Sequence, residues 1–148
     1  EYMEFCIEKL NPRGKVLEIG FGLGYSATAI CSRKDVEEYS VIECAPLIWD
    51  EVEKFKTKFP NIKINLIKGR WEDVMYLAGK FDFAFFDPLN GDGKVQWAKF
   101  VMDCIRYNMK VGSVIGMYST TDIISNLPFT KETYHQFDVN DELKLNHL

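Results

Sequence analysis

The clearest structural signal in the chain is the segment Lys15-Val16-Leu17-Glu18-Ile19-Gly20-Phe21-Gly22-Leu23-Gly24-Tyr25. Its apolar first half predicts a strand buried on both faces of a parallel sheet. Its three glycines allow a tight turn and a close approach to a ligand, and the residues that follow can begin a helix whose amino end favours polar or anionic groups. A second apolar stretch, residues 39–42, ends in Glu43, whose carboxylate is placed to accept hydrogen bonds from ribose hydroxyls. Together these features predict a site for a nucleoside-containing cofactor.

The spacing of the glycines narrows the choice of cofactor. The dinucleotide fingerprint is G-x-G-x-x-G, and Tyr25 stands where its third glycine would be. A bulky residue there argues against close docking of a pyrophosphate, and the acidic Glu18 within the strand fits S-adenosylmethionine (SAM) binders better than dehydrogenases. We therefore expect SAM as the cofactor, with a nicotinamide dehydrogenase as the weaker alternative. The alternative without any cofactor is that the glycines form an ordinary turn and that the glutamate is an incidental surface residue.

Strands and helices alternate along the rest of the chain. This order predicts an α/β fold with a doubly wound, mostly parallel sheet, the first strand at its centre and the ligand at the carboxyl ends of the strands. The tail, residues 121–148, contains possible strands at 129–134 and 142–145, and its shortness predicts elements missing at both ends of the fold. The expected helices are 2–10, 25–32, 46–59 and 96–108, with a short one near 69–74, and the expected strands are 15–19, 39–42, 62–67, 81–86 and 114–118.

Length and composition predict one compact domain. The chain has 148 residues, 47% of them hydrophobic, which is enough for a sizeable core. The sequence contains no run of eighteen apolar residues, so we predict no membrane span. The net charge of −4, with acids and bases intermixed, makes nucleic acid an unlikely partner. The oligomeric state is left open.

The cysteines and histidines argue against a metal site. Four cysteines are scattered without a C-x-x-C pair, and both histidines, His135 and His147, lie in the tail. This pattern indicates free thiols in a reducing compartment, hence a cytoplasmic location, and it predicts no metal ligands.

Asp87 is the candidate catalytic residue. It follows the hydrophobic strand 81–86 directly, so the fold delivers its carboxylate to the ligand edge of the sheet. There it can bind a cationic or N–H-bearing acceptor, orient one nitrogen toward the methyl group and accept the proton lost on transfer. The alternative is that Asp87 only caps the following turn.

Four segments together resemble the class I SAM-dependent methyltransferases. The resemblance is to the guanidinoacetate N-methyltransferase group and the related fungal-type protein arginine methyltransferases, and it covers about residues 2–122. The most distinctive segment is the Gly-x-Trp-Glu-Asp-Val element. The segments are Gly14 to Gly24, Val41-Ile42-Glu43-Cys44, Lys68-Gly69-Arg70-Trp71-Glu72-Asp73-Val74 and Phe81 to Asp87.

The resemblance implies a role for each matching residue. Glu43 would hold the ribose, and Asp87 would meet the nitrogen of a guanidino acceptor. The glycine turn would line the methionine part of SAM, Met3 would lie near it, and Thr121 and Asp122 align loosely with a substrate-side loop. Packing in the core is the alternative role for Trp71 and Met3. The cofactor-binding residues implied are Met3, Gly20, Phe21, Gly22, Leu23, Gly24, Tyr25 and Ser26, with Cys44, Ala45, Trp71 and Glu72 around the adenine.

The expected protein is thus a single methyltransferase domain, residues 1–148, that lacks the family's amino-terminal lid. It would catalyse N-methylation of a small guanidino or amino compound, or of an arginine-like side chain. The sequence departs from the family after Asp87, where Pro88-Leu89-Asn90 replaces the usual Thr and aromatic residue. Two other functions stay open. One is methylation of exocyclic amines of nucleobases, whose D-P-P-aromatic element would be degenerate here, and the other is a SAM-binding module without catalysis.

Overall fold

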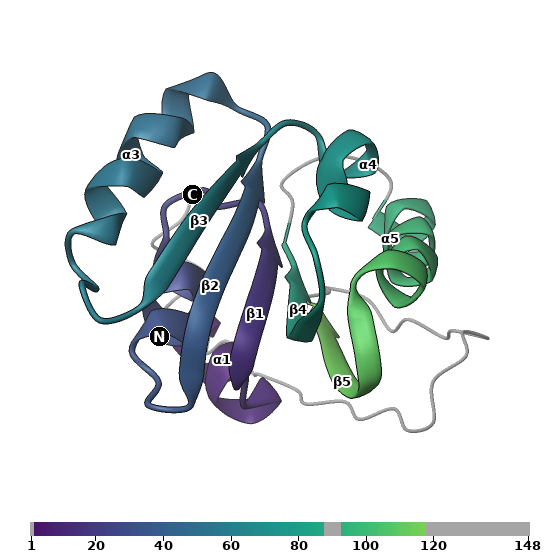
Figure 1. The fold of residues 1–148 in the computed structure, drawn as a ribbon, viewed down its shortest axis with the longest axis horizontal. Coiled ribbons are helices and arrows are strands. Elements are labelled where there is room, and N and C mark those ends of the chain that lie inside the picture. The colour runs from purple at the N-terminus through teal and green to yellow at the C-terminus, as the bar shows by residue number, and fades with distance from the viewer. Residues whose placement is uncertain (1, 88–92, 118–148) are drawn as a thin grey trace, which may run out of the picture.

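One parallel sheet of five strands organises the molecule (Figure 1). The structure is a computed structural model that describes residues 2–87 and 93–117. Each neighbouring pair of strands is parallel, and the strand order is β3-β2-β1-β4-β5. The expected doubly wound sheet with the first strand at its centre is confirmed. The strands are β1 (Gly14–Ile19), β2 (Val36–Glu43), β3 (Lys63–Lys68), β4 (Phe81–Phe86) and β5 (Met109–Met117).

Helices cover both faces of the sheet (Figure 1). The first three helices supply core residues to one face, and the later ones supply core residues to the other. None of the helices within residues 2–87 and 93–117 is long and apolar enough to cross a membrane. The helices are α1 (Tyr2–Leu10), α2 (Tyr25–Cys31), α3 (Pro46–Lys56), α4 (Trp71–Val74), the 3-10 helix η1 (Met75–Leu77) and α5 (Gly93–Tyr107).

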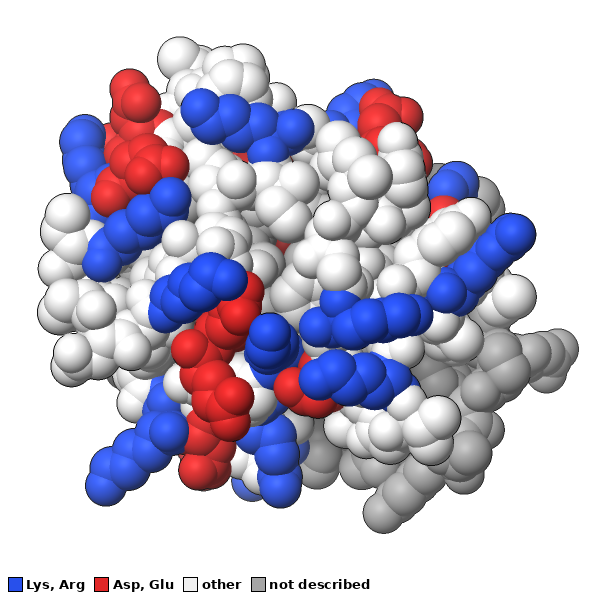
Figure 2. Space-filling model, viewed as in Figure 1, with Lys and Arg blue, Asp and Glu red and all other residues white. Residues whose placement is uncertain are grey.

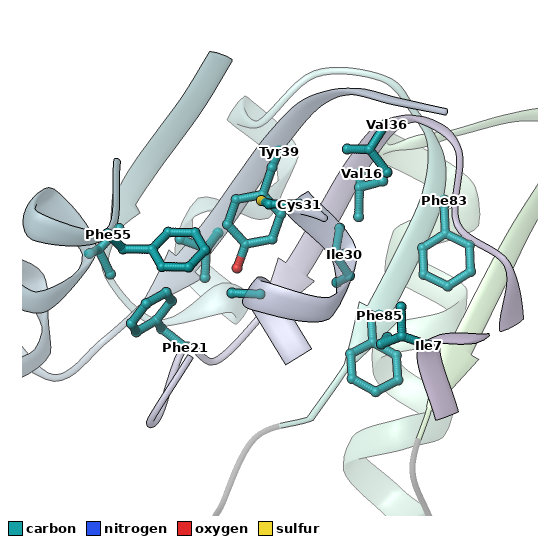
Figure 3. Close-up of a cluster of buried hydrophobic side chains, with 13 residues drawn as sticks. Ile7, Val16, Phe21, Ile30, Cys31, Val36, Tyr39, Phe55, Phe83 and Phe85 are labelled. Atoms are coloured by element: carbon teal, nitrogen blue, oxygen red, sulfur yellow. The ribbon is translucent and has the colours of Figure 1, made fainter. Parts of the chain in front are cut away.

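Strand alternation divides the core in two. Along β1, Val16 belongs to the core under α1, α2 and α3, whereas Leu17 and Ile19 belong to the core under α4, η1 and α5. Because successive side chains point to opposite faces of a strand, Glu18 faces the first of these cores. Figure 3 shows that first core, where side chains of the early helices meet those of the central strands.

Several element ends differ from expectation for physical reasons. Strand β2 begins at Val36, which is buried and pairs with Gly14, so pairing with β1 extends the strand through the polar residues before Tyr39. Helix α3 ends at Lys56, three residues before the expected end. Phe59 nevertheless packs on Phe55, with ring centroids 5.0 Å apart, so the apolar spacing of the sequence continues beyond the helix. The predictions that fall on Pro88, Leu89, Asn90, Thr121 and Asp122 and on strands 129–134 and 142–145 lie outside the described residues.

The amino-terminal edge of the sheet carries ion pairs between neighbouring strands. Glu38 on β2 pairs with Lys15 on β1 at 3.2 Å and with Lys63 on β3 at 3.0 Å. Asp82 on β4 pairs with Lys110 on β5 at 2.7 Å and accepts the backbone N–H of Lys15 at 2.9 Å. These contacts link all five strands at the edge opposite the carboxyl ends.

We expect Gly24→Ala to destabilise the fold more than Gly22→Ala. Both glycines have positive φ (+73° and +53°), but only at Gly24 would a new Cβ meet a neighbour, 2.8 Å from Cζ of Phe21. That ring is buried and packs against Phe55, with centroids 5.3 Å apart, so it has little room to move. Overpacking of this kind costs about 1–3 kcal/mol. Urea denaturation of both variants measures the difference, and equal losses would show that the Phe21 ring yields freely.

Candidate cofactor and catalytic site

The site lies where the chain connections reverse, at the carboxyl ends of β1 and β4. After β1 the chain enters α2 on one face, and after β4 it enters α5 on the other. Ligands of doubly wound sheets bind at such a reversal, outside the carboxyl ends of the strands. The backbone N–H of Asp87 donates to the carbonyl of Ile19 at 3.2 Å, and Gly20 N–H donates to Ile42 at 2.9 Å. The structure therefore brings the glycine turn and Asp87 side by side.

Glu43, at the tip of β2, is the centre of a hydrogen-bond network that ties three loops together. Its carboxylate accepts the N–H of Phe21 at 2.9 Å and the N–H of Ala45 at 2.7 Å. Its carbonyl accepts the N–H of Gly69 at 3.1 Å and the indole N–H of Trp49 at 3.0 Å. A carboxylate oxygen can accept more than one hydrogen bond, so both oxygens keep capacity for ligand hydroxyls.

The glycine turn presents its backbone and two exposed side chains. The Phe21 ring is turned into the core, whereas Leu23 and Tyr25 are 82% and 67% exposed. No atom of residues 2–87 and 93–117 lies within 4 Å of the position that a Cβ on Gly22 would take, so the described part of the chain leaves the space above this residue open. That these residues line the cofactor stays a prediction.

Asp87 carries a carboxyl group in an apolar setting. Burial raises its pKa from the ordinary 3.8 to about 6. Its charge also contributes to raising the pKa of the Cys6 thiol on α1, after the larger effect of burial, so α1 lies close to Asp87. Met3 on the same helix packs against the first core. The expected placement of Met3 near the site is compatible with this packing.

Glu18 is a second buried acid on the same face of the sheet. It is fully buried, and burial raises its pKa to about 8, an effect that the hydroxyls of Ser26 and Tyr39 oppose and the charge of Asp87 reinforces. Within the described residues, no basic side chain contributes to the pKa of Glu18 or of Asp87. Two acids without a cation among the described residues therefore lie near the carboxyl ends of β1 and β4.

The residues expected around the adenine lie beyond the tip of β2. Cys44 is exposed, and Glu72 pairs with Arg70 at 3.0 Å. The indole of Trp71 is buried in the second core, edge-on to Phe86 at 5.7 Å and to Phe100 at 5.8 Å. Packing is thus a role that Trp71 has in the structure, while adenine contacts of Cys44, Ala45, Trp71 and Glu72 stay predictions.

Sequence reasoning left two residues out of the candidate site. Glu18 was noted as an acid within an apolar strand, and that mismatch was the signal of a special role. Trp49 gave no signal, since it stands in an ordinary amphipathic helix, and only the fold shows its indole N–H holding the tip of β2.

Comparison with protein families gives one match over almost the whole chain. The sequence model of the guanidinoacetate N-methyltransferase family matches residues 2–148.

Two solved structures illustrate the likeness of the fold. A methyltransferase from Pyrococcus furiosus has a TM-score of 0.63 at 17% identity, over 80% of this chain and 61% of its own. Fibrillarin from Aeropyrum pernix, solved with natively bound S-adenosyl-L-methionine, has a TM-score of 0.54 at 18% identity, over 72% of this chain and 44% of its own. The chain thus spans less than two thirds of the length of either protein, and at these identities the likeness shows the fold.

The buried Glu18 predicts an unusual dependence of stability on pH. Its pKa is raised from the ordinary 4.5 to about 8 on folding, so the folded state holds this proton more tightly than the unfolded state does. The associated stability is fully present below the unfolded pKa and is lost as the pH rises through the folded pKa. We expect the free energy of unfolding to fall between about pH 5 and pH 8 in the wild type, and to fall less in Glu18→Gln.

Urea denaturation at a series of pH values measures this difference. Asp87 is present in both proteins, so the effect of its own burial is common to the two profiles. Parallel pH profiles for the two proteins would show that Glu18 ionises normally in the folded state.

Proposed function

The chain belongs to the guanidinoacetate N-methyltransferase family, and on this premise we propose that it binds SAM and methylates a nitrogen of a small guanidino or amino compound. SAM is the cofactor of this family. The observation that carries the proposal is Asp87, a carboxyl group with a raised pKa at the carboxyl end of β4, beside the glycine turn and without a cation among the described residues. The single-domain organisation over residues 1–148 and the cytoplasmic location stay predictions.

The residues at the crevice fit SAM. The cofactor carries a positive ammonium group, and Glu18 under the glycine turn has no cation beside it in the described part of the chain. Open space above Gly22 lets a ligand approach the backbone. We assign the ribose to the Glu43 carboxylate, the adenine to the side of Cys44 and Glu72, and the methionine end to the glycine turn above Glu18.

Asp87 is the proposed site of the acceptor. A guanidinium group is cationic, so a desolvated carboxylate attracts it strongly and can accept hydrogen bonds from its N–H groups. Holding these groups localises the positive charge and leaves one nitrogen with electron density for attack. An arginine-like side chain offers the same chemistry, and a small molecule fits the family to which the chain belongs.

The proposed reaction is a direct displacement. SAM, when bound, would supply an electrophilic methyl group on its sulfonium sulfur. The acceptor nitrogen would form a bond to this methyl carbon as the carbon–sulfur bond breaks, and S-adenosylhomocysteine would leave. Asp87 orients the acceptor nitrogen and takes the proton that this nitrogen loses, for which a pKa of about 6 is well suited because the group is ionised at neutral pH and can still hold a proton. Positioning of two reactants supplies about 7–11 kcal/mol of barrier lowering in favourable cases.

The surface charge favours a small acceptor over nucleic acid. Acidic and basic side chains lie next to one another over much of the face shown in Figure 2. The net charge is −4, and a nucleic-acid partner would be expected to select a basic stripe. This supports guanidino methylation over methylation of nucleobase amines.

An assay of radiolabelled methyl transfer tests the proposed acceptor. The panel is guanidinoacetate, free arginine, an arginine-containing peptide and a primary amine, with a short oligonucleotide as the contrasting acceptor. Transfer to a guanidino compound or to the amine, without transfer to the oligonucleotide, supports the proposal. Transfer to the oligonucleotide alone would establish the nucleobase alternative, and SAM binding without transfer to any acceptor would establish the non-catalytic alternative.

We expect Asp87→Asn to bind SAM with near-normal affinity and to lose turnover by about 10²–10⁴-fold, the usual contribution of general acid–base catalysis. The amide keeps the size of the side chain but cannot take the proton. The matched control is Asp82→Asn at the other end of β4, where Asp82 pairs with Lys110. Steady-state kinetics measure both variants, and near-normal turnover of Asp87→Asn would exclude Asp87 as the acid–base group.

We expect Glu43→Gln to weaken SAM binding by at least about tenfold. The amide keeps one accepting oxygen, so either Phe21 N–H or Ala45 N–H loses its acceptor, and one hydrogen bond to a charged group is worth about 1.5–3 kcal/mol. The control is Glu38→Gln, on the same strand but at the ion pairs of the opposite edge. Calorimetric titration with SAM, S-adenosylhomocysteine and NAD gives the affinities. Binding of NAD in place of SAM would overturn the assignment of the cofactor.

A further inference from the structure

A carboxyl oxygen without a hydrogen bond lies buried under the glycine turn. Glu18 Oε2 accepts the hydroxyl of Tyr39, whereas Oε1 has no hydrogen-bond partner among the described residues. The hydroxyl of Ser26 lies close enough to affect the pKa of Glu18 but does not reach hydrogen-bonding geometry at Oε1. An unpartnered buried polar atom is costly, so a function has to account for this one.

Tyr39 is built to hold one orientation. It is fully buried on β2, and it stands opposite Val16 in the register of the sheet, so its ring shares a face with Glu18. Its ring lies 6.3 Å from that of Phe55, which in turn packs edge-on against Phe21 of the glycine turn (Figure 3). The Tyr39 hydroxyl is therefore a fixed donor on one side of the Glu18 carboxyl, and Oε1 is left on the other.

The groups facing this pair are acidic or neutral. From β2 comes Glu43, from α2 come Ser26 and Cys31, and from the end of β4 comes Asp87. Each titratable member of the set is neutral or negative, and none of the described lysines or arginines contributes to the pKa of Glu18 or Tyr39. The missing partner of Oε1 is thus expected to be a cation.

We propose that Tyr39 is a positioning residue, whose hydroxyl holds the Glu18 carboxyl so that Oε1 receives the ammonium group at the methionine end of bound SAM. This inference rests on the proposed function, which supplies the cofactor. The hydroxyl contacts only Glu18 and not the ligand. Without it, the carboxyl can rotate and direct its charge away from the ammonium group.

The test separates the two ends of the ligand. S-adenosylhomocysteine carries the ammonium group, whereas 5′-methylthioadenosine keeps the adenosine and the thioether sulfur and lacks the amino-acid end. In Tyr39→Phe we expect the affinity for S-adenosylhomocysteine to fall about tenfold, the effect of one hydrogen bond to a charged group. The affinity for 5′-methylthioadenosine should stay within about twofold of wild type, because this ligand lacks the ammonium group and the substitution changes no contact with the adenosine.

Two further variants sharpen the result. Glu18→Gln keeps an acceptor for the Tyr39 hydroxyl but removes the negative charge, so it should show the same selective loss, to a larger extent. Tyr76→Phe, on the exposed 3-10 helix of the other face, removes a tyrosine hydroxyl far from Glu18 and should bind both ligands as the wild type does. Calorimetry gives the affinities, and thermal unfolding verifies that each variant is folded.

Each other outcome is decisive. Equal weakening of both ligands in Tyr39→Phe would mean that Tyr39 supports the whole crevice, and unchanged affinities would mean that it positions nothing; either result overturns the inference. Wild-type protein that binds both ligands equally tightly would also overturn it, while leaving the proposed cofactor intact. Wild-type protein that binds neither ligand would overturn the proposed function together with the inference.

Discussion

The arrangement of the crevice depends on the hydrogen bonds that converge on Glu43. Its carboxylate fastens the glycine turn after β1 and the loop after β2, and its carbonyl fastens the loop after β3 and the indole of Trp49. Loops at the end of a sheet are usually its most mobile parts. Here one residue cross-links three of them, so the backbone around the expected ribose position is ordered by the protein before any ligand arrives. Such preorganisation lowers the entropic cost of binding.

The same end of the sheet also carries two acids whose negative charge is unfavourable there. Glu18 is buried and Asp87 is half-buried, both have raised pKa values, and no basic side chain of the described residues offsets them. A protein selected for stability alone would replace these acids with apolar residues. In the proposed function, a cationic ligand provides the positive charge that pairs with these acids. The acids then lower the stability of the free protein and raise its affinity for the ligand.

Much of this fold was predictable from local signals, and the contacts inside the site were not. The buried strand, the glycine turn and Asp87 could be placed because hydrophobic runs, glycines and the order of elements carry that information. The early start of β2 was missed, since Glu37 and Glu38 look like loop residues until the ion pairs of Glu38 with its neighbouring strands are known. The bond between Tyr39 and Glu18 depends on the register of β1 against β2, which single-sequence patterns do not determine.

The two edges of the sheet respond to different properties of the solvent. At the amino edge, Lys15, Lys63 and Lys110 form partly exposed ion pairs with Glu38 and Asp82. Dissolved salt weakens exposed ion pairs, and the screening length falls from about 10 Å at 0.1 M ionic strength to about 3 Å at 1 M. At the carboxyl edge the acids are buried, so screening reaches them poorly and proton activity governs them instead. Ionic strength therefore affects the ion pairs at the amino ends of the strands, and pH affects the acids at their carboxyl ends. The salt concentration and the pH of a buffer can change the two ends independently.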